Sequence, residues 1–398
     1  MKSYKQHLTL ALQERHKAGL FRERQILQSP QGTDIRLNGK KTISFCSNDY
    51  LGLANDQDVV AAFREGVDLY GAGSGASHLV SGHQKAHHEL EERLADFTGR
   101  SRALLFSSGY MANVGVLTTL LDKNSQVYED RLNHASLLDG GLFSKARFRR
   151  YPHLDTGKLD AMLEDSALDS TLIVSDGVFS MDGDLAPLDK LLQICSRKNV
   201  QLMIDDAHGF GCLGRTGGGI NEYFQQLGVQ VDEDNLTVLV GTLGKAFGTS
   251  GAFVSGSETL IETLIQFCRP YIYTTAMPAA IAHATLTSLE KVRTEHWRRE
   301  WLQEMISRFR RHAAELDLEL MDSHTPIQAV VLGSAEAAVA ASRLLLDQGI
   351  FVSAIRPPTV PQGTARLRVT FSAAHSETQF GQLLAAMERL KKIEAENE

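Results

Sequence analysis

The sequence holds few cysteines, no excess of basic residues and no long apolar run. Its four cysteines, among 398 residues, include no C-x-x-C pair, which argues against a disulfide framework or zinc ribbon and fits a reducing, cytoplasmic compartment. The formal net charge of -7 lacks the basic footprint with which nucleic-acid binders neutralise phosphates. No segment reaches about 18 uncharged apolar residues, the length of a membrane-spanning helix. We therefore expect a globular protein without nucleic-acid or membrane partners.

Short apolar runs instead alternate with amphipathic segments along most of the chain. Five runs have the length of a strand: 103–106, 171–175, 200–204, 236–240 and 252–254. Helical patterns such as 188–196 separate several of them. This alternation predicts an α/β fold with a mainly parallel sheet covered by helices on both faces. Ligands of such sheets bind beyond the carboxyl ends of the strands, so the polar groups that follow these runs are expected on one rim.

The length of the chain predicts more than one packed unit, because a single hydrophobic core stops growing at roughly 250 to 300 residues. We expect an N-terminal helix and strand segment over 1–50, a large domain over 51–285 and a smaller C-terminal α/β domain over 286–398. The first 24 residues mix apolar and charged side chains at helical spacing and predict an amphipathic helix rather than a signal peptide. The second boundary rests on a long charged helical pattern that begins after about residue 280.

One lysine, Lys245, lies among glycines, alanines and threonines in TVLVGTLGKAFGTSGAFVSG, with no acidic neighbour in that segment. A lysine beside a strand end is usually an exposed surface residue. Small neighbours, however, let a ligand approach closely, and burial would then lower the pKa of Lys245. A neutral amine in such a place is a nucleophile toward an aldehyde.

The segment VQLMIDDAHGFG places Asp205 at the end of a buried strand and His208 three residues later. An aspartate at a strand end often only forms a turn. In a pyridoxal-phosphate site Asp205 would have a specific role, because a fixed carboxylate keeps the pyridine nitrogen of this cofactor protonated. Alternation along the strand points Asp205 and Asp206 to opposite faces, and we choose Asp205 for that role.

A strand, a turn and a helix are expected in ALLFSSGYMANVGVL. Serine and glycine at a helix start are common caps. The free amides of Gly109 and Tyr110, together with the helix dipole, also favour a phosphate there. Thr242, three residues before Lys245, would add a hydroxyl.

Three further patterns argue against other functions. Residues 71–82, GAGSGASHLVSG, partly match a dinucleotide fingerprint, but a helical pattern rather than a strand precedes them, so we reject a nicotinamide oxidoreductase. Ser180 lacks the G-x-S-x-G elbow of serine hydrolases. His83 and His87 stand four residues apart, but the third ligand and the catalytic glutamate of a helical zinc site are missing. We therefore expect a solvated helix there and no metal.

Taken together, these residues resemble the fold-type I pyridoxal-phosphate enzymes and, more narrowly, the α-oxoamine synthases. The likeness covers nearly the whole chain and is carried by FCSNDYLGL, LFSSGYMANVGV, DRLNHASLLDG, SDGVFSMDGD, IDDAHGFG, GTLGKAFG, YIYTTAMP and AIRPPTVPQGTARLRVTFSAAH. It implies a fold-type I transferase with a mainly parallel large-domain sheet and a smaller C-terminal α/β domain. The run AIRPPTVPQGTARLR is similar to the family members of biotin synthesis.

The resemblance implies pyridoxal 5'-phosphate as cofactor, a homodimer and a role for each matching residue. Lys245 would hold the cofactor aldehyde, Asp205 would pair with the pyridinium, and His208 would bond the phenolic oxygen. His134 would stack on the ring and contact the substrate. The cofactor pocket would be completed by Gly109, Tyr110, Ser180 and Thr242, with Thr274 and Thr275 reaching the phosphate of the partner subunit. The substrate contacts would come from Arg22, Arg356 and Thr359, with Arg24 an equal candidate for the role of Arg22.

The implied reaction is the decarboxylative condensation of L-alanine with pimeloyl-CoA or a pimeloyl carrier protein, which releases the thiol and CO2. Other members of the family use glycine with acetyl-CoA, or serine with a long acyl thioester. A catalytically silent cofactor-binding protein on the same fold is the alternative from another class. His78 departs from the family pattern, in which this position often carries Arg or Gly, and would alter local substrate contacts.

Overall fold

A seven-stranded sheet forms the centre of the molecule, a computed structural model that describes residues 3–17, 20–22, 24–164 and 170–397. The strand order is β3-β9-β8-β7-β6-β4-β5. The strands are β3 (Arg102–Phe106), β4 (Ser125–Asp130), β5 (Arg147–Tyr151), β6 (Ser170–Asp176), β7 (Gln201–Asp205), β8 (Val238–Thr242) and β9 (Ala252–Gly256). Only β9 runs against its neighbours, β3 and β8, while the other pairs are parallel. The predicted α/β fold with a mainly parallel sheet is confirmed.

The five apolar runs are confirmed as strands, but β4 and β5 carry no such run. β4 has the sequence SQVYED and buries all six residues, because it lies between β5 and β6. β5 has the sequence RFRRY and forms the edge of the sheet, where its arginines stay partly exposed. Because both strands are rich in polar residues, a search for apolar runs did not predict them.

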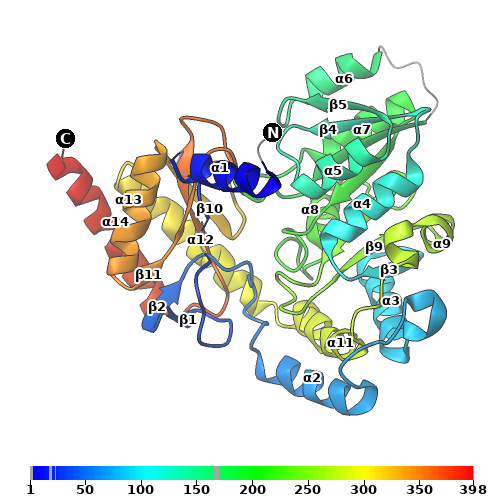
Figure 1. The fold of residues 1–398 in the computed structure, drawn as a ribbon, viewed down its shortest axis with the longest axis horizontal. Coiled ribbons are helices and arrows are strands. Elements are labelled where there is room, and N and C mark those ends of the chain that lie inside the picture. The colour runs from blue at the N-terminus through cyan, green and yellow to red at the C-terminus, as the bar shows by residue number, and fades with distance from the viewer. Residues whose placement is uncertain (1–2, 18–19, 23, 165–169, 398) are drawn as a thin grey trace.

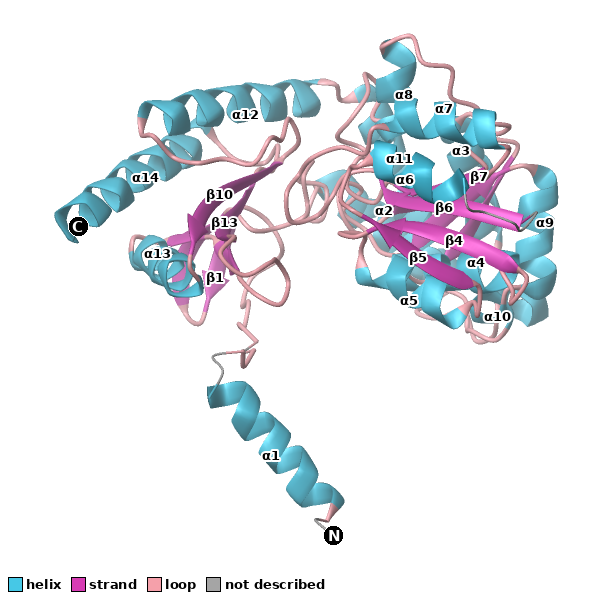
Figure 2. Ribbon diagram, turned by 90° about the horizontal axis from the view of Figure 1, so that it is seen from above, coloured by secondary structure: helices cyan, strands magenta, loops and turns pink. Residues whose placement is uncertain are grey.

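Helices cover both faces of the sheet (Figure 2). Leu105, Ile173 and Ile204 share one core with α3 (Lys85–Thr98), α6 (Thr156–Glu164), α7 (Leu188–Lys198) and α8 (Gly219–Gln226). Leu104 and Val174 enter a second core with α4 (Gly109–Leu120), α5 (Ala135–Phe143) and α9 (Glu258–Phe267). Successive strand residues thus point to opposite sides. None of the helices that the structure describes is both long enough and apolar enough to cross a membrane.

The C-terminal part forms two smaller sheets. One contains β10 (Ile327–Gly333), β13 (Ala365–Thr370) and β12 (Ser353–Ile355), and the other contains β1 (Asp34–Leu37), β2 (Lys40–Ser44) and β11 (Ile350–Phe351). The N-terminal strands therefore lie beside the C-terminal part, far away in sequence (Figure 1). Three helices complete this part: α12 (Trp297–Glu315), α13 (Ala335–Asp347) and α14 (Glu377–Asn397). The division at residues 50 and 285 stays a prediction.

The predicted N-terminal helix is α1 (Tyr4–Lys17), which projects away from the rest of the molecule (Figure 2). No residue of α1 is buried, so burial against the rest of the chain does not stabilise this helix. Arg22 was expected within this helix, but it lies beyond its end in an exposed, non-helical stretch. That part of the expectation is wrong, because helical spacing alone does not set where an unpacked helix ends.

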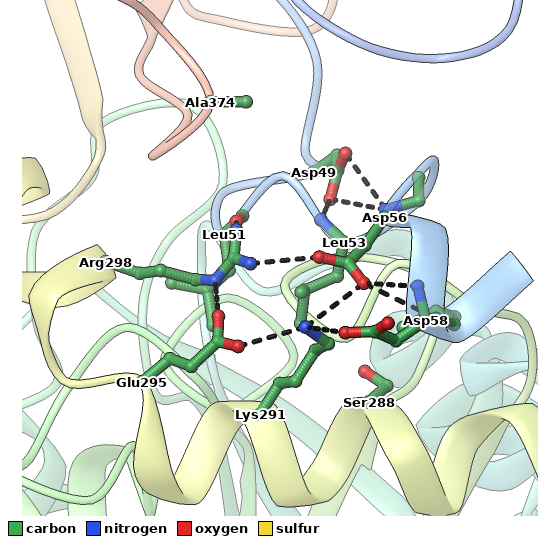
Figure 3. Close-up of polar contacts among 12 residues, drawn as sticks. Asp49, Leu51, Leu53, Asp56, Asp58, Ser288, Lys291, Glu295, Arg298 and Ala374 are labelled. Atoms are coloured by element: carbon green, nitrogen blue, oxygen red, sulfur yellow. Dashed lines mark hydrogen bonds and ion pairs between the residues drawn. The ribbon is translucent and has the colours of Figure 1, made fainter.

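A cluster of charges holds the connection between α11 (Ala279–Thr294) and α12 (Figure 3). The Nζ atom of Lys291 lies close to three carboxylates, at 3.3 Å from Asp56, 2.7 Å from Asp58 and 3.0 Å from Glu295. Arg298 pairs with Asp56 at 3.0 Å and donates to the carbonyl of Leu51 at 2.7 Å. Asp56 also caps α2 (Gln57–Tyr70). The cluster thereby ties α2, α11 and α12 together.

Candidate active site

The candidate site lies at the rim where the parallel strands end. Asp176 ends β6, Asp205 ends β7, Thr242 ends β8, and Ser107 follows β3. Because β3, β6, β7 and β8 run in the same direction, these ends meet at one edge of the sheet. The predicted convergence of polar groups on one rim is confirmed.

Lys245 lies in the loop between β8 and β9, where the N–H of Gly248 donates to its carbonyl at 2.8 Å. Burial lowers the pKa of Lys245 to about 8, although Asp205 and Asp176 favour the charged form. The acids absent from the surrounding sequence are thus supplied by the ends of neighbouring strands. At pH 7 an amine with this pKa is mostly charged, but its neutral fraction is far larger than that of an ordinary lysine, and a neutral amine can act as nucleophile or base.

Asp205 and Asp206 point toward different partners, as strand alternation predicts. Asp205 accepts from Asn113 Nδ2 in α4 at 2.6 Å and from the N–H of Ala207 at 3.0 Å. Asp206 instead accepts from the N–H of Ile220 at the start of α8 at 2.6 Å. Burial raises the pKa of Asp206 well above its usual value. Only Asp205 shares a hydrogen-bond network with the other predicted site residues.

That network runs from Asp205 to His134 through two residues that the sequence analysis missed. Asn113 Nδ2 also donates to Ser136 Oγ at 2.8 Å, and Ser136 Oγ lies 2.7 Å from His134 Nδ1. His134 caps α5, and its N–H donates to Asp176 at 2.7 Å. Asn113 stands four residues after Gly109, hence on the same helix face, and this spacing was the available signal.

His208 is buried and bonds through Nδ1 to the hydroxyl of Tyr50 at 2.7 Å. Burial, followed by the charge of Lys245, lowers the pKa of His208 well below its usual value, so the ring is neutral. Arg368 of β13 donates to Asn48 Oδ1 at 3.2 Å and to the carbonyl of Ser180 at 2.6 Å. Asn48, Tyr50 and Arg368 were also missed, although all three lie within segments that carry the resemblance, FCSNDYLGL and AIRPPTVPQGTARLRVTFSAAH.

The start of α4 offers a place for an anion. Ser108 caps the helix and accepts from the N–H of Met111 at 3.3 Å. The first amides of a helix have no intrahelical partner and attract negative charge. A Cβ at Gly109 would meet only Ala252, at 4.0 Å, so the space beside this turn is open. Thr242 is half-buried, and its hydroxyl donates to the carbonyl of Gly251 at 3.1 Å.

The remaining predicted residues lie farther along the chain. Thr274 and Thr275 precede α11, and Thr275 forms a β-bridge with Ser77 of the glycine-rich loop. Thr359 is exposed, and its N–H donates to the carbonyl of Arg356 at 3.1 Å. Arg356 lines a groove of about 980 Å³ together with Phe21, the neighbour of Arg22. Among the described residues, no hydrogen bond joins Arg22 or Thr359 to the rim network.

The donor set fits a phosphorylated pyridine aldehyde. Three groups lie at the same rim of the sheet: an amine with a lowered pKa after β8, a carboxylate fixed by an amide at the end of β7, and a helix start with free amides after β3. These are the groups that pyridoxal phosphate needs at its aldehyde, ring nitrogen and phosphate. Asp205 keeps its orientation through Asn113 and Ala207, which prepares it for a ring nitrogen.

Comparison with curated proteins supports the resemblance. One similar protein is the 8-amino-7-oxononanoate synthase of Pseudomonas syringae pv. tomato, 58% identical over 382 residues, which cover 96% of this chain and 95% of that protein. The enzyme of the same name from Pseudomonas putida is 57% identical over 380 residues, covering 96% of each chain. The predicted resemblance is confirmed.

Solved structures share the fold, and one of the two described next holds PLP. A serine palmitoyltransferase from S. paucimobilis with a bound PLP–myriocin adduct matches with a TM-score of 0.90 and 31% identity, covering 97% of both chains. The 8-amino-7-oxononanoate synthase of Francisella tularensis matches with a TM-score of 0.77 and 34% identity, covering 90% of this chain and 99% of that one. Pyridoxal phosphate is therefore the cofactor, as predicted. The family model "Aminotransferase class I and II" matches residues 40–387, and the chain belongs to that family.

Proposed function

We infer that this chain makes 8-amino-7-oxononanoate from L-alanine and a pimeloyl thioester, releasing the thiol and CO2. The observation that carries the inference is the Lys245 amine, whose pKa burial lowers to about 8 beside Asp205 and Asp176. Curated relatives that are 56% to 59% identical bear the name of the enzyme that makes this product. A silent binding protein would have no need of such an activated amine.

Pyridoxal phosphate supplies an aldehyde that binds amino groups and a ring that accepts negative charge from the α carbon. Lys245 would hold the aldehyde, and Asp205 would hold the proton on the ring nitrogen. His208, kept neutral and oriented by Tyr50, would bond the phenolic oxygen. The amides of Gly109 and Tyr110 would face the phosphate. The pocket would be completed by Ser180 and Thr242, with Thr274 and Thr275 serving the partner subunit of a homodimer.

Lys245 would also move the proton. Once the substrate amine has replaced it, the released lysine is a base that takes the α proton of L-alanine. A pKa of about 8 lies near the working pH, so the neutral, basic form of this amine is more accessible than in an ordinary lysine. Arg356 would bind the carboxylate of alanine through its planar guanidinium fork.

His134 would act on the thioester. Asn113 donates to Ser136 Oγ, and the N–H of Ser136 donates to His134 Nδ1 at 3.3 Å. The Ser136 hydroxyl is therefore left to donate to the same Nδ1, which places the proton of a neutral His134 on Nε2. Burial lowers the pKa of His134, in keeping with this neutral form. His134 Nε2–H can then donate to the thioester oxygen as negative charge develops on it, a contribution of about 3 to 4 kcal/mol for a well-placed donor.

Two experiments test the proposal. Borohydride reduction of the holoenzyme followed by digestion is expected to leave a pyridoxyl group on the peptide that contains Lys245, and a label on another lysine would overturn the assignment. Thiol release is then measured with L-alanine, glycine or L-serine, each paired with pimeloyl-CoA, a pimeloyl carrier protein or acetyl-CoA. L-Alanine with a pimeloyl thioester is expected to be fastest, and preference for glycine would refute the proposal.

The second candidate is the condensation of L-serine with a long acyl thioester. Its support is the TM-score of 0.91 to the serine palmitoyltransferase of Sphingomonas wittichii, which is 30% identical to this chain. The identity to the 8-amino-7-oxononanoate synthases is nearly twice as high, so the alanine reaction is preferred. The homodimer is tested separately by light scattering of the holoenzyme, and a fully active monomer would contradict it.

A further inference from the structure

Four histidines and one glutamate gather outside the rim network, on α3 and the turn η1 (His78–Gly82) before it. Within the described residues, the nitrogen or oxygen atoms of His78, His83 and His87 lie within 4.8 Å of one another, and so do those of His83, His88 and Glu91. In the sequence only His83 and His87 stand out as a pair at helical spacing, because the contact of His78 with α3 is made only in the folded chain.

His87 is not available as a metal ligand. Its Nδ1 accepts from the N–H of Gln84 at 3.0 Å, so its Nε2 carries the proton and donates to the carbonyl of Met277 at 2.8 Å. The side chain is fully buried, and the expectation of a solvated helix is therefore wrong for His87. These two bonds fix α3 to the chain before α11.

His83 is oriented by His78. The Nδ1 atoms of the two rings are 2.9 Å apart, so one donates to the other. The ring of His78 stacks on Tyr271, with centroids 5.1 Å apart and planes 12° from parallel. When His83 donates, its Nε2 keeps a lone pair that faces Glu91 Oε2 at 3.9 Å, too far for a hydrogen bond. Two acceptors that face each other in this way favour a cation between them.

A hydrogen bond to the second carboxylate oxygen of Glu91 fixes this side chain. Oε1 accepts from the N–H of Leu105 in β3 at 2.9 Å, and the side chain is 13% exposed. Burial raises the pKa of Glu91 to about 8, against the smaller opposing effects of the Leu105 N–H and Arg102. His88 stands three residues earlier on the same helix face, is mostly exposed, and has its Nε2 3.4 Å from Glu92.

We propose that His83, His88 and Glu91 bind a divalent transition metal of the zinc type, with His78 as the residue that orients His83. Two imidazoles and one carboxylate form a donor set that zinc uses with a water in the fourth position, and the exposed His88 leaves room for that water. In the tautomer in which His83 Nδ1–H donates to His78, this hydrogen bond is the usual outer-shell support of a metal-binding imidazole.

Cobalt tests the site, because Co²⁺ takes the place of zinc and absorbs visible light. The holoenzyme is treated with a chelator, dialysed and titrated with Co²⁺, and we expect one tightly bound ion per chain that Zn²⁺ displaces. His83→Asn, His88→Asn and Glu91→Gln should each abolish binding at equimolar Co²⁺. His78→Asn should weaken it about 10- to 100-fold, as the loss of outer-shell support does.

The variants are chosen so that folding does not confuse the result. The amide oxygen that Glu91→Gln introduces would still accept from the N–H of Leu105, and His88 is 65% exposed, so neither change leaves a buried group unpaired. His324→Asn, at a side chain that is 73% exposed in the C-terminal part, is the control and should bind Co²⁺ normally. Failure of Co²⁺ to bind, or binding that survives His83→Asn, would overturn the proposal. Loss in His78→Asn with retention in His88→Asn and Glu91→Gln would overturn this ligand set.

Discussion

Two lysines, Lys245 and Lys291, each face three carboxylates but respond in opposite ways. Burial works against the charged form of Lys291, yet hydrogen bonds to Asp58, Glu295 and Asp56 outweigh it and raise its pKa above the usual value. Burial also acts on Lys245, and there it prevails and lowers the pKa to about 8. The number of nearby acids therefore does not decide the protonation state of a partly buried amine.

The difference lies in whether the amine itself contacts the acids. The Nζ atom of Lys291 lies between 2.7 and 3.3 Å from its three partners, whereas Lys245 makes no ion pair within 4 Å to any residue in the described ranges. The acids near Lys245 accept from other groups: Asp205 from Asn113, Asp176 from the N–H of His134, and Asp206 from the N–H of Ile220. The Lys291 ammonium, paired with three carboxylates, stabilises the fold, while the Lys245 amine, without a direct ion pair, remains reactive.

The largest effect is expected from Lys245→Ala, which removes the reactive amine. Turnover of the alanine and pimeloyl thioester pair should fall about 10²- to 10⁴-fold, the range for loss of a positioned general base. The measurement is thiol release under saturating substrate. Lys291→Ala is the matched control at the other lysine and should keep kcat within about threefold of the parent, since Lys291 lies in the α2–α11–α12 cluster rather than at the rim. Equal losses in both variants would break the comparison.

Next in size is Asn113→Ala, which frees the carboxylate of Asp205. We expect kcat to fall about 10- to 100-fold, because small displacements of a reacting group carry costs of this order. Asn113 acts through Asp205, so a second measurement is needed: the pH titration of the absorption band of bound cofactor should shift. Asn124→Ala, at an exposed asparagine, is the control. An unchanged titration with reduced turnover would show that Asn113 does not act through Asp205.

The rim could be predicted from the sequence because local patterns specify it. Apolar runs mark β7 and β8, and in parallel strands the residue after each run must reach the same edge, as Asp205 and Lys245 do. Strand alternation was enough to separate Asp205 from Asp206. Such inferences need only the period of the strand and the direction of the chain.

The rest depends on contacts between segments that are distant in sequence. β4 is buried although its sequence SQVYED is polar, since neighbours on both sides cover it. Arg368 reaches Ser180 from β13, 188 residues away, and no local pattern indicates such a pair. The burial of His87 likewise depends on Met277, which lies 190 residues further along. Partners of this kind become visible only when the chain is folded.

A smaller effect is expected for Lys291→Met, measured as the free energy of unfolding at pH 7. Loss of the ammonium leaves Asp56, Asp58 and Glu295 close together without their shared cation. We expect a destabilisation of about 2 kcal/mol, between the values for exposed and buried ion pairs. Lys85→Met is the control, because its pair with Glu89 is 77% exposed at the lysine and should be worth less than about 0.5 kcal/mol. Equal losses would show that burial adds nothing at Lys291.

The smallest effect should have the opposite sign. In the apoenzyme the folded pKa of Lys245, about 8, lies below the unfolded value of 10.5, so the charged amine opposes folding at pH 7 and this penalty disappears as the pH rises from about 8 to 10.5. Lys245→Met should therefore stabilise the apoenzyme at pH 7 by about 1 kcal/mol, a discounted figure because Lys245 is only partly buried and solvent screens its charge. Denaturant unfolding at pH 7 and pH 9.5 measures the stability at both pH values, and the gain from Lys245→Met should be smaller at pH 9.5.

Lys291 should show no such pH dependence. Because its folded pKa is raised, the charged amine stabilises the fold fully below pH 10.5, and this stabilisation is lost only above the folded pKa. Lys291→Met should therefore be equally costly at pH 7 and 9.5. Lys190→Met, at an exposed lysine of α7, is the control and should leave both measurements unchanged. A loss of stability in Lys245→Met at pH 7 would mean that the acids at the rim do pair with this amine, and the contrast between the two lysines would not hold.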